Sequence, residues 1–597
     1  MRVADYIFKY LADKGVKHVF LVTGGGAMFL NDALGREKRI RYVCNLHEQA
    51  CAMAAEGYAR VSGMPGVVSV TTGPGGTNAL TGVVGAWLDS VPMLIISGQV
   101  KTSTTISACP ELKLRQLGDQ ELNIVDVVRP VTKYAKMIVS VSEIAGELDN
   151  AWRLCIHGRP GPVWLDIPLN IQSAEMPTGK TSVRPLKLNM PQVSEQQIKD
   201  IAVRLKTAKR PVFLVGGGIR NAGMADSFLP IAEKWNIPVL TGISGIDLIP
   251  SNHKLFFGRP GILGERPANF IMQNSDLLLV IGSRMGIRQI GYAFGTVARH
   301  ACKIMVDADE AELNKPTFQP DIKIHSDAGI FLQKLSCCLP SLPARREWLN
   351  YCLRVKKRYP VILPEHRRRK DYVSSYVLPE IISRHCRKDT VIVTGNGCAY
   401  TSTFQTISIK KGMRVFANQG CASMGYGLPA AIGAAFSAEK RPICCITGDG
   451  SIQMNLQELQ TVVSYSLPIK IFVYNNNGYL SIKLTQKSYF QGKFTGSDPE
   501  SGVRLPALKK IAAAYGMPYR CLRNNVEAER KMPEILAFRG AMLIEVMTDP
   551  LEELGPKAAS HQMPDGSIVS ALLEDLAPFL SREELSDNMM MAGHQKY

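Results

Sequence analysis

The chain has 597 residues, which is too long for a single hydrophobic core and predicts three or four domains. Its hydrophobic fraction of 46% and charged fraction of 20% are ordinary for a globular protein and exclude a fibrous or low-complexity chain. The formal net charge of +18 raises the question of nucleic-acid binding, but the basic residues are scattered. The one dense run, His366–Lys370, is interpreted as a solvated linker, so we expect no nucleic-acid partner. A weaker interpretation is that the positive field attracts anionic substrates.

The cysteines and the apolar runs indicate the cellular compartment of the protein. The 14 cysteines include no Cys-x-x-Cys pair, so a cysteine metal cluster is not expected and reduced thiols are the default. No apolar run approaches the roughly 20 residues that a membrane-spanning helix needs. The first residues, MRVADYIFKYLADKG, have the pattern of an amphipathic helix rather than of a signal peptide. The sequence therefore predicts a cytoplasmic protein without a membrane partner.

The first part of the chain, residues 1–180, alternates helical patterns with short apolar runs. We expect the runs Val67–Val70, Met93–Ile96 and Pro162–Asp166 to be buried strands joined by helices. A polar, proline-containing stretch, Ser173–Ser194, is expected to be a linker. This alternation is typical of a parallel α/β sheet.

Two more units follow the same pattern. The second, residues 190–342, has expected strands at Pro211–Val215, Leu277–Ile281 and Lys303–Val306. Basic helical sequence then leads to a third unit, residues 372–548. The tail, residues 549–597, ends in the methionine-rich segment DNMMMAGHQKY and is expected to be frayed or dependent on a partner. The predicted fold class is thus α/β, with three doubly wound parallel-sheet domains.

The most informative segment lies in the third unit and reads GDGSIQMNLQELQTVVSYSLPIKIFVYNN, from Gly448 to Asn476. The apolar run Ile443–Thr447 precedes Asp449, and a second apolar run ends at Asn476. A strand–helix–strand path brings both residues to the carboxyl end of one parallel sheet, where such sheets bind ligands. Carboxylate and amide oxygens suit Mg²⁺, with phosphate oxygens completing its shell, and the glycines beside Asp449 let the backbone approach a phosphate. The segment predicts a magnesium-diphosphate site.

This segment resembles the diphosphate-binding motif of thiamine diphosphate (ThDP) enzymes. The resemblance covers nearly the whole chain, and its closest form is the acetohydroxyacid synthase-like branch. It implies that Asp449, Asn476 and the backbone carbonyl of Gly478 hold Mg²⁺. It also implies that Met424, in the turn SMGYGLP, supports the bent cofactor, although an ordinary buried methionine is the alternative. The expected neighbours of the diphosphate are Gly448, Gly450 and Ser451.

The first unit supplies NLHEQACAMAAEGYARVSG, which places Glu48 in the first turn of an alanine-rich helix. A carboxylate there can simply favour the helix dipole, and the zinc motif His-Glu-x-x-His is absent. The segment resembles the catalytic-glutamate motif of ThDP enzymes, and Gly73 and Gly75 follow at the expected place. The resemblance implies that Glu48 protonates the cofactor's pyrimidine ring, which turns the exocyclic amine into a base. Because the two cofactor-binding domains of one site belong to different subunits in this family, a homodimer or homotetramer is implied.

The middle unit resembles the FAD-binding domain of the same synthases. The segments FGRPGILGERPANF, DLLLVIGSRMGIRQIGY, KIMVDADEAELNK and DIKIHSDAG follow the expected order. Arginines suit the pyrophosphate of a flavin dinucleotide, and carboxylates suit its ribose or adenine. The alternative is a middle domain that has lost the nucleotide. The implied flavin contacts are Arg220, Gly282, Arg284, Arg288, Asp307 and Asp327.

Three departures from the family fall where the synthases bind their acceptor. Of a Phe-Gln-Glu element the chain keeps Gln120, the expected substrate-side catalytic residue, but Asp119 replaces the phenylalanine. Thr485 aligns with a tryptophan that holds a small apolar 2-keto acid, and Cys398–Tyr400 replaces a Gln-His-Gln element. Smaller, polar groups predict a larger or more hydroxylated acceptor.

The resemblance implies a carboligase that depends on ThDP, Mg²⁺ and FAD. It would decarboxylate pyruvate or another 2-keto acid and add the two-carbon unit to a carbonyl acceptor. That acceptor is either pyruvate, as in acetolactate synthase, or a nucleotide-linked keto-sugar. The alternatives are a decarboxylase of 2-keto acids or acyl-CoA that ligates nothing, and a non-catalytic nucleotide-binding subunit. The presence of Glu48, Asp449 and Asn476 argues against the last of these.

Overall fold

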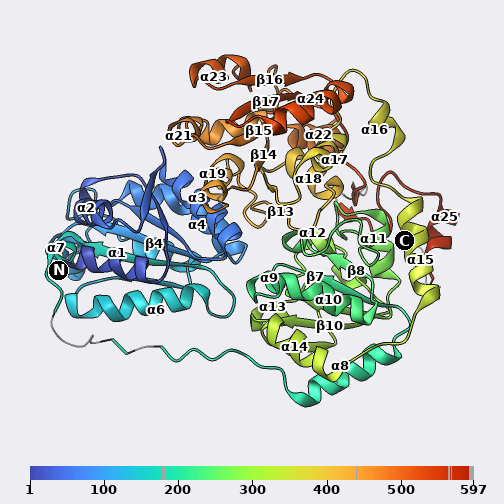
Figure 1. Cartoon of the computed structure of the whole chain (residues 1–597), viewed down its shortest axis with the longest axis horizontal. Helices are drawn as coiled ribbons and strands as arrows, with labels where there is room; N and C mark the ends of the chain where they lie inside the picture. The colour runs from blue at the N-terminus through green and yellow to red at the C-terminus, as the bar shows by residue number, and fades with distance from the viewer. Residues whose placement is uncertain (178–182, 185, 439, 563–564, 566–567, 591–597) are drawn as a thin grey trace.

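The computed structural model describes residues 1–597 except 178–182, 185, 439, 563–564, 566–567 and 591–597. Within this part of the chain, three parallel sheets follow one another along the sequence, each packed between helices (Figure 1). The predicted fold class is therefore confirmed.

The first sheet has the strand order β2-β1-β3-β4-β6-β5. The expected strands of this unit are confirmed as β3, β4 and β6, and all their residues are buried. Strands that helices cover on both faces are apolar along their whole length, which is why they stand out as continuous runs. The strands are β1 (His18–Leu21), β2 (Arg41–Cys44), β3 (Gly66–Val70), β4 (Met93–Gln99), β5 (Tyr134–Met137) and β6 (Pro162–Pro168). The helices are α1 (Val3–Asp13), α2 (Met28–Arg36), α3 (Glu48–Ser62), α4 (Pro74–Leu88), α5 (Ile124–Val128), α6 (Ile144–Ile156) and α7 (Leu169–Ser173).

The second sheet, in the middle unit, has the order β11-β10-β9-β7-β8. The three strands expected here are confirmed as β7, β9 and β10. The strands are β7 (Pro211–Val215), β8 (Val239–Thr241), β9 (Leu277–Ile281), β10 (Cys302–Asp307) and β11 (Ile322–His325). The helices are α8 (Glu195–Thr207), α9 (Gly218–Asn221), α10 (Ala225–Trp235), α11 (Arg266–Gln273), α12 (Ile287–Ile290), α13 (Glu310–Asn314) and α14 (Ala328–Cys338).

The third sheet has the order β13-β12-β14-β15-β17-β16, and β14 contains the expected strand before Asp449. Two helices, α15 (Arg346–Arg358) and α16 (Pro364–Arg368), lead into this unit. The strands are β12 (Val391–Thr394), β13 (Arg414–Phe416), β14 (Ile443–Gly448), β15 (Ile469–Asn475), β16 (Tyr519–Leu522) and β17 (Met542–Met547). The helices are α17 (Val377–His385), α18 (Cys398–Thr406), α19 (Gly427–Ser437), α20 (Asp449–Ile452), α21 (Glu458–Ser464), α22 (Leu480–Tyr489), α23 (Leu508–Ala514) and α24 (Asn525–Ala537).

Helices α3 and α19 join the first unit to the third. A Cβ added at Gly57 of α3 would lie 2.1 Å from the carbonyl oxygen of Ala430, and one at Gly433 of α19 would lie 1.8 Å from that of Ala54. Only glycine permits so close a helix contact. Residue 57 faces 430 and residue 54 faces 433, so the two helices run antiparallel. The alanine-rich helix α3 is therefore closely packed against α19.

The tail packs on the middle unit instead of fraying. It forms a short hairpin of β18 (Ser560–Gln562) and β19 (Ile568–Ser570), and a last helix, α25 (Arg582–Asn588). The side-chain amide of Asn274 donates to the carbonyl of Asn588 at 2.9 Å and accepts from the backbone of Met590 at 2.7 Å. Met589 is buried against Phe270 of α11. The expectation of a frayed tail is therefore wrong for its described residues, because its apolar side chains cover a helix of the middle unit; residues 563–564, 566–567 and 591–597 lie outside the described part.

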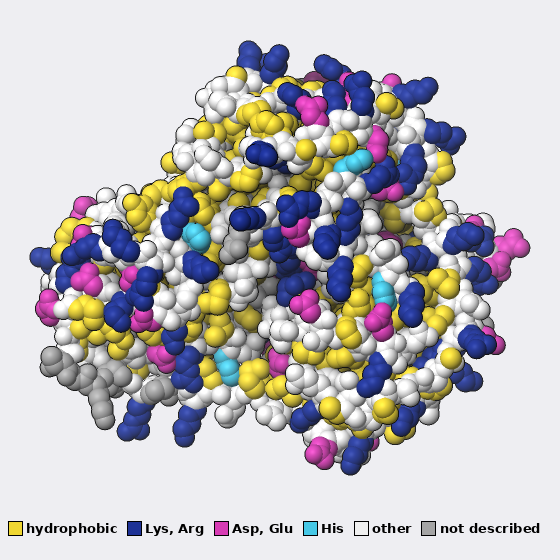
Figure 2. Space-filling view, viewed as in Figure 1, with side chains coloured by type: hydrophobic (Ala, Val, Ile, Leu, Met, Phe, Trp, Pro, Cys, Tyr) yellow, Lys and Arg dark blue, Asp and Glu magenta, His cyan; other side chains and the backbone are white. Residues whose placement is uncertain are grey.

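Other sequence expectations concern linkers and the surface. No helix or strand lies between α7 and α8 in the described residues of the expected linker, of which 178–182 and 185 are not described. The basic run near residue 366 is partly helical, and Arg367 pairs with Glu380 at 2.6 Å. Figure 2 shows lysine and arginine side chains spread over the visible face of the molecule. In the described parts of the chain, no helix combines the length and the apolar character that crossing a membrane requires.

Candidate active site

Three neighbouring parallel strands of the third sheet, β12, β14 and β15, end at one edge in polar residues. Asn396 follows β12, Asp449 follows β14 and Asn476 follows β15. The carboxylate of Asp449 accepts a hydrogen bond from the backbone N–H of Gly478 at 3.1 Å. The structure thus places Asp449 beside the segment Asn476–Gly478, as the spacing predicts.

The oxygens at this edge fit a cation. Asp449 and Asn476 are each only 4% exposed, and the side-chain oxygen of Asn476 has no hydrogen-bond partner among the described residues. Burial raises the pKa of Asp449 to about 6, although hydrogen bonds from Gly478 and Gly450 oppose the shift. Gly478 has φ of +124°, and a Cβ there would lie 2.2 Å from the carbonyl oxygen of Ser497. A buried carboxylate beside an unpartnered amide oxygen is a donor set that Mg²⁺ prefers.

The surroundings of this edge suit a phosphate group. A Cβ on Gly450 would lie 2.3 Å from the ring of Tyr479, so glycine is required there, whereas the side of Gly448 is open. The hydroxyl of Ser451 accepts from the backbone N–H of Gly425 at 3.1 Å, which ties the motif to the turn after Met424. The side chain of Met424 is 39% exposed, so it is not the ordinary buried methionine of the alternative interpretation.

Sequence reasoning missed Asn396. Its side-chain amide donates to the carbonyl of Ser423 at 2.7 Å, which fixes the turn before Met424. The side-chain oxygens of Asn396 and Ser423 are buried without a partner in the described structure. The available signal was the Gly-Asn-Gly triplet, residues 395–397, at the carboxyl end of β12, which is similar to the Gly-Asp-Gly triplet at the carboxyl end of β14.

Glu48 is the first residue of α3 and is 8% exposed. Its carboxylate accepts a hydrogen bond from Asn78 of α4 at 3.0 Å. The segment before it is anchored by Glu458 of the third unit, which accepts from the side chain of Asn45 at 2.8 Å and from the backbone of Leu46 at 2.9 Å. Neither Asn78 nor Glu458 was predicted, because both contacts depend on the packing of separate helices.

The structure brings Gly73 and Gln120 together. Gly73 has φ of +63°, and a Cβ there would lie 2.3 Å from the carbonyl oxygen of Gln120. Gln120 also has a positive φ, +60°, and its side chain is exposed. A Cβ on Gly75 would lie 3.0 Å from Thr71, so this position is also tight.

Among the described residues of one chain, Glu48 forms no hydrogen bond with Asp449 or Asn476, and its side chain accepts from Asn78 instead. The contact between α3 and α19 is centred near Gly57 and Ala430. Glu48 lies about 13 Å from Gly57 along the axis of α3, because a helix rises about 1.5 Å per residue. Helix α19 runs antiparallel to α3, and Met424 precedes the first turn of α19. Met424 therefore lies beyond the end of the contact that is opposite to Glu48. Glu48 and Met424 therefore occupy opposite ends of the helix pair.

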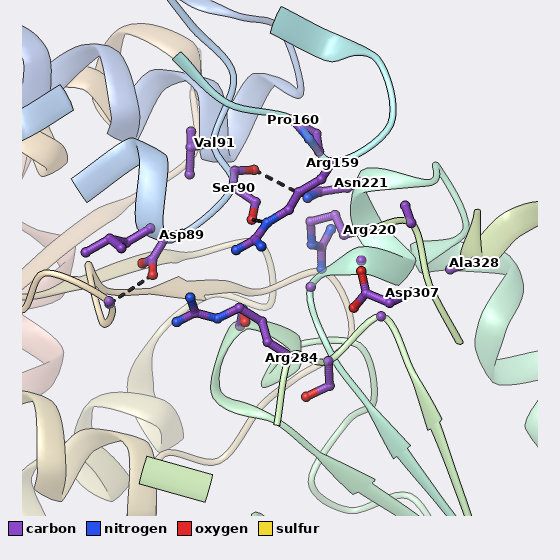
Figure 3. A pocket seen from close by; sticks show the side chains of 18 of the residues that line it. Asp89, Ser90, Val91, Arg159, Pro160, Arg220, Asn221, Arg284, Asp307 and Ala328 are labelled. Carbon is purple, nitrogen blue, oxygen red and sulfur yellow. Dashed lines mark hydrogen bonds between the residues drawn. The ribbon is translucent and has the colours of Figure 1, made fainter. Parts of the chain in front are cut away.

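A cavity of about 410 Å³ lies where the middle unit meets the other two (Figure 3). Arg159 from the first unit, Arg220 and Arg284 from the middle unit, and Arg414 from the third all line it. This volume is in the range of cofactor pockets. All six residues predicted to contact a flavin dinucleotide lie in its wall, namely Arg220, Gly282, Arg284, Arg288, Asp307 and Asp327.

Two of these residues already bind other parts of the chain. Arg220 donates to Asp247 at 2.7 Å, and Asp327 caps α14 by accepting from the backbone of Gly329 at 2.8 Å. Asp247 is completely buried in its side chain and also pairs with Arg414 at 2.6 Å. Asp247 was not predicted, since a single aspartate in an apolar segment carries no motif. It orients two arginines at the cavity wall.

The cavity carries an excess of positive charge. Arg284 and Arg288 form no ion pair with any carboxylate of the described residues, whereas Arg159 pairs with Asp309 at 2.8 Å. Burial raises the pKa of Asp307 to about 6. Unpaired guanidinium groups beside one buried carboxylate fit an anionic ligand that also offers a hydroxyl or amine.

The residues that depart from the family lie in different places. Thr485 is exposed on α22 and donates to the carbonyl of Ser481 at 3.0 Å. Asp119 is exposed beside Gln120. Tyr400 is buried on α18, where the guanidinium of Arg288 lies 5.4 Å from its ring. Tyr400 and Arg288 line a smaller pocket, beside residues 259–265, and Tyr400 is not in the wall of the 410 Å³ cavity.

Buried oxygen groups at the edge of one parallel sheet and a buried glutamate at a helix start beside another are the arrangement expected of ThDP enzymes. The family models agree. Three family models of the thiamine pyrophosphate enzymes match the chain. The model of the "N-terminal TPP binding domain" matches residues 1–124, that of the "central domain" residues 198–335, and that of the "C-terminal TPP binding domain" residues 395–546.

Curated relatives show to which branch of the ThDP enzymes the chain belongs. The large subunit of acetolactate synthase isozyme 1 of Escherichia coli is 32% identical over 93% of this chain and 95% of its own length. The probable acetolactate synthase large subunit of Methanocaldococcus jannaschii is 32% identical, with 93% of both chains covered. The acetolactate synthase large subunit of Lactococcus lactis is 30% identical, and the match covers 93% of this chain and 93% of that subunit. The chain belongs to the acetolactate synthase-like branch of the ThDP enzymes and is a ThDP-dependent carboligase.

Proposed function

We propose that this protein decarboxylates pyruvate and transfers the resulting two-carbon unit to a second carbonyl compound, with Mg²⁺ holding the diphosphate of ThDP. The observation that carries the proposal is the unpartnered buried oxygen of Asn476 beside Asp449 and Gly478. When bound, ThDP supplies an acidic ring carbon that adds to the keto group and accepts the electron pair released with CO₂.

The protein's own groups have distinct tasks in this reaction. Asp449, Asn476 and the carbonyl of Gly478 would hold the metal, and Ser451 would face the diphosphate. Glu48 would hold a proton against the pyrimidine ring, with Asn78 fixing its carboxylate at 3.0 Å. Gln120, which is exposed and lies next to Gly73, would contact the substrate.

We further propose that the working unit is a homodimer or a dimer of dimers. The reason is the separation of Glu48 and Met424 at opposite ends of the α3–α19 pair. A second copy related by a twofold axis brings each Glu48 to the other chain's metal edge, because such an interface is reciprocal. Apolar side chains near both half-sites are exposed in the single chain, including Leu46, Leu117, Met424, Met454 and Ile482.

The acceptor is proposed to be a second pyruvate, as in the acetolactate synthases that the chain is similar to. A polar ketone such as a nucleotide-linked keto-sugar is the second candidate, and the exposed hydroxyl of Thr485 is the observation that favours it. The test is product analysis with pyruvate alone and with pyruvate plus polar ketones. Acetaldehyde as the only product would contradict carboligation and favour a simple decarboxylase.

Replacing Thr485 by tryptophan should shift acceptor use from a polar ketone toward pyruvate, because the added ring fills space that a bulky acceptor needs. Consumption of pyruvate without an acceptor should change less, since acceptor entry follows decarboxylation. Competition between pyruvate and a keto-sugar measures the shift. Thr485→Ser, which keeps the hydroxyl, is the matched control. Efficient acetolactate formation and no sugar adduct by the unmodified protein would contradict the second candidate.

We propose that the cavity of about 410 Å³ between the three units binds FAD. In this branch FAD is not needed to move electrons in the reaction. The purified protein should then be yellow, and Arg284→Ala should lower its flavin content severalfold, because Arg284 has no carboxylate partner in the described structure. Absorbance of flavin released on denaturation gives the occupancy. Arg387→Ala, which removes an exposed arginine paired with Asp389, is the control. A protein that stays colourless after incubation with FAD would contradict the assignment.

A further inference from the structure

A buried lysine lies directly behind the segment that carries the proposed metal ligands. Lys483, on α22, is only 2% exposed, although neighbouring Lys487 on the same helix is exposed. Its ammonium group donates to the carbonyl of Asn476 at 2.8 Å and to that of Asn477 at 3.5 Å. Burying an ammonium group is costly unless it is hydrogen-bonded, so these two contacts explain why it can remain there.

The segment that Lys483 supports has an unusual backbone. Asn477 has φ of +59° and Gly478 has φ of +124°, so two successive residues lie at positive φ. Such conformations persist only when surrounding contacts hold them. Other contacts fix the flanks: the N–H of Asn477 donates to the side chain of Asn475 at 3.2 Å, and that of Tyr479 to the carbonyl of Ser497 at 2.8 Å. Lys483 holds the carbonyl groups between them.

Lys483 also contributes charge. Burial lowers the pKa of Lys483, and the nearby carboxylates of Asp449, Asp498 and Asp549 oppose this shift. Its positive charge repels a cation at Asp449, whereas its hydrogen bonds hold Asn476 and Gly478 in place for that cation. The two effects change the affinity for Mg²⁺ in opposite directions, so a substitution can separate them.

We infer that Lys483 is a positioning residue, which fixes the segment Asn476–Gly478 so that its side-chain and backbone oxygens face the metal. This inference rests on the proposed function, because it assumes that Mg²⁺ and ThDP bind at this edge. It extends the metal site to a side chain that touches neither the metal nor the cofactor.

The test is a titration of Mg²⁺ at a fixed concentration of ThDP, followed by calorimetry, for the unmodified protein and for Lys483→Met. We expect the affinity for Mg²⁺ to fall about 10- to 100-fold, as is typical when a supporting contact of a metal ligand is removed. Lys487→Met, one turn further along α22 and exposed, should bind Mg²⁺ as the unmodified protein does. An unchanged affinity in Lys483→Met would overturn the inference. A tighter one would also overturn it, since charge repulsion would then dominate.

Thermal unfolding of the metal-free proteins and their FAD content show whether the variant is folded. If Lys483→Met does not fold, Lys483→Gln is the second variant; its shorter donor should weaken Mg²⁺ binding in the same direction, and an unchanged affinity would overturn the inference. The unmodified protein separates the two hypotheses. If it shows no Mg²⁺-dependent binding of ThDP, the proposed function fails and the role of Lys483 with it. If it binds both and Lys483→Met does so equally well, only the role of Lys483 fails.

Discussion

Replacing Asp449 by alanine should abolish binding of ThDP in buffer that contains Mg²⁺. The variant removes the buried carboxylate that accepts a hydrogen bond from Gly478 and lies beside Asn476. Without the bridging cation, the diphosphate loses its link to the oxygen ligands of this edge. We expect the affinity for ThDP to fall by at least about 100-fold, the upper end of the loss seen when a mere supporting contact of a metal is removed. Calorimetric titration measures this change.

Asp389→Ala is the matched control for this experiment. Asp389 precedes β12, so it lies at the amino end of the same sheet, and it pairs with exposed Arg387 at 2.6 Å. Its loss removes one negative charge from the unit without touching the carboxyl edge. ThDP should bind to this variant as it does to the unmodified protein. Unchanged ThDP affinity in Asp449→Ala would refute the anchor at this edge.

The position of Asp449 beside Asn476–Gly478 could be predicted because it depends on local patterns. Two apolar runs joined by a helix must be parallel neighbours or near neighbours, and their carboxyl ends must meet. Residues as distant as Asp449 and Asn476 therefore come together without any knowledge of the remaining chain. The same reasoning located the buried strands of all three sheets, since parallel strands are apolar throughout.

The supporting residues could not be predicted, because their roles depend on packing between elements. Lys483 lies in the segment LSIKLTQK, where a lysine is equally compatible with the exposed face of a helix. Asp247 orients two arginines of the central cavity that are distant from it in sequence. A pattern of small residues in the sequence also does not reveal that α3 and α19 pack antiparallel, with close contacts at Gly57 and Gly433. That orientation is the basis of the proposal that each site forms between two chains.

Replacing Glu48 by glutamine should leave ThDP bound but lower the turnover of pyruvate by at least about 100-fold, the usual scale for losing acid–base assistance. The amide is nearly isosteric and can still accept the hydrogen bond from Asn78, so the first unit should keep its structure. It cannot give a proton to the pyrimidine ring as a carboxylic acid does. Steady-state turnover and ThDP affinity, measured on the same preparation, separate the two effects. Turnover near that of the unmodified protein would mean that another group activates the cofactor.

The same variant tests where the site forms. In a chain that carries Glu48→Gln the metal edge is intact, and in a chain that carries Asp449→Ala the glutamate is intact. If each site takes Glu48 from one chain and Asp449 from its partner, a mixed dimer contains one complete site and one site with both defects. Random pairing of equal amounts makes half of the dimers mixed, so activity should recover to about a quarter of that of the unmodified protein. A mixture that stays as inactive as its components, although the chains have exchanged, would place Glu48 and Asp449 of one site on a single chain. That outcome would contradict the proposal that each site forms between two chains.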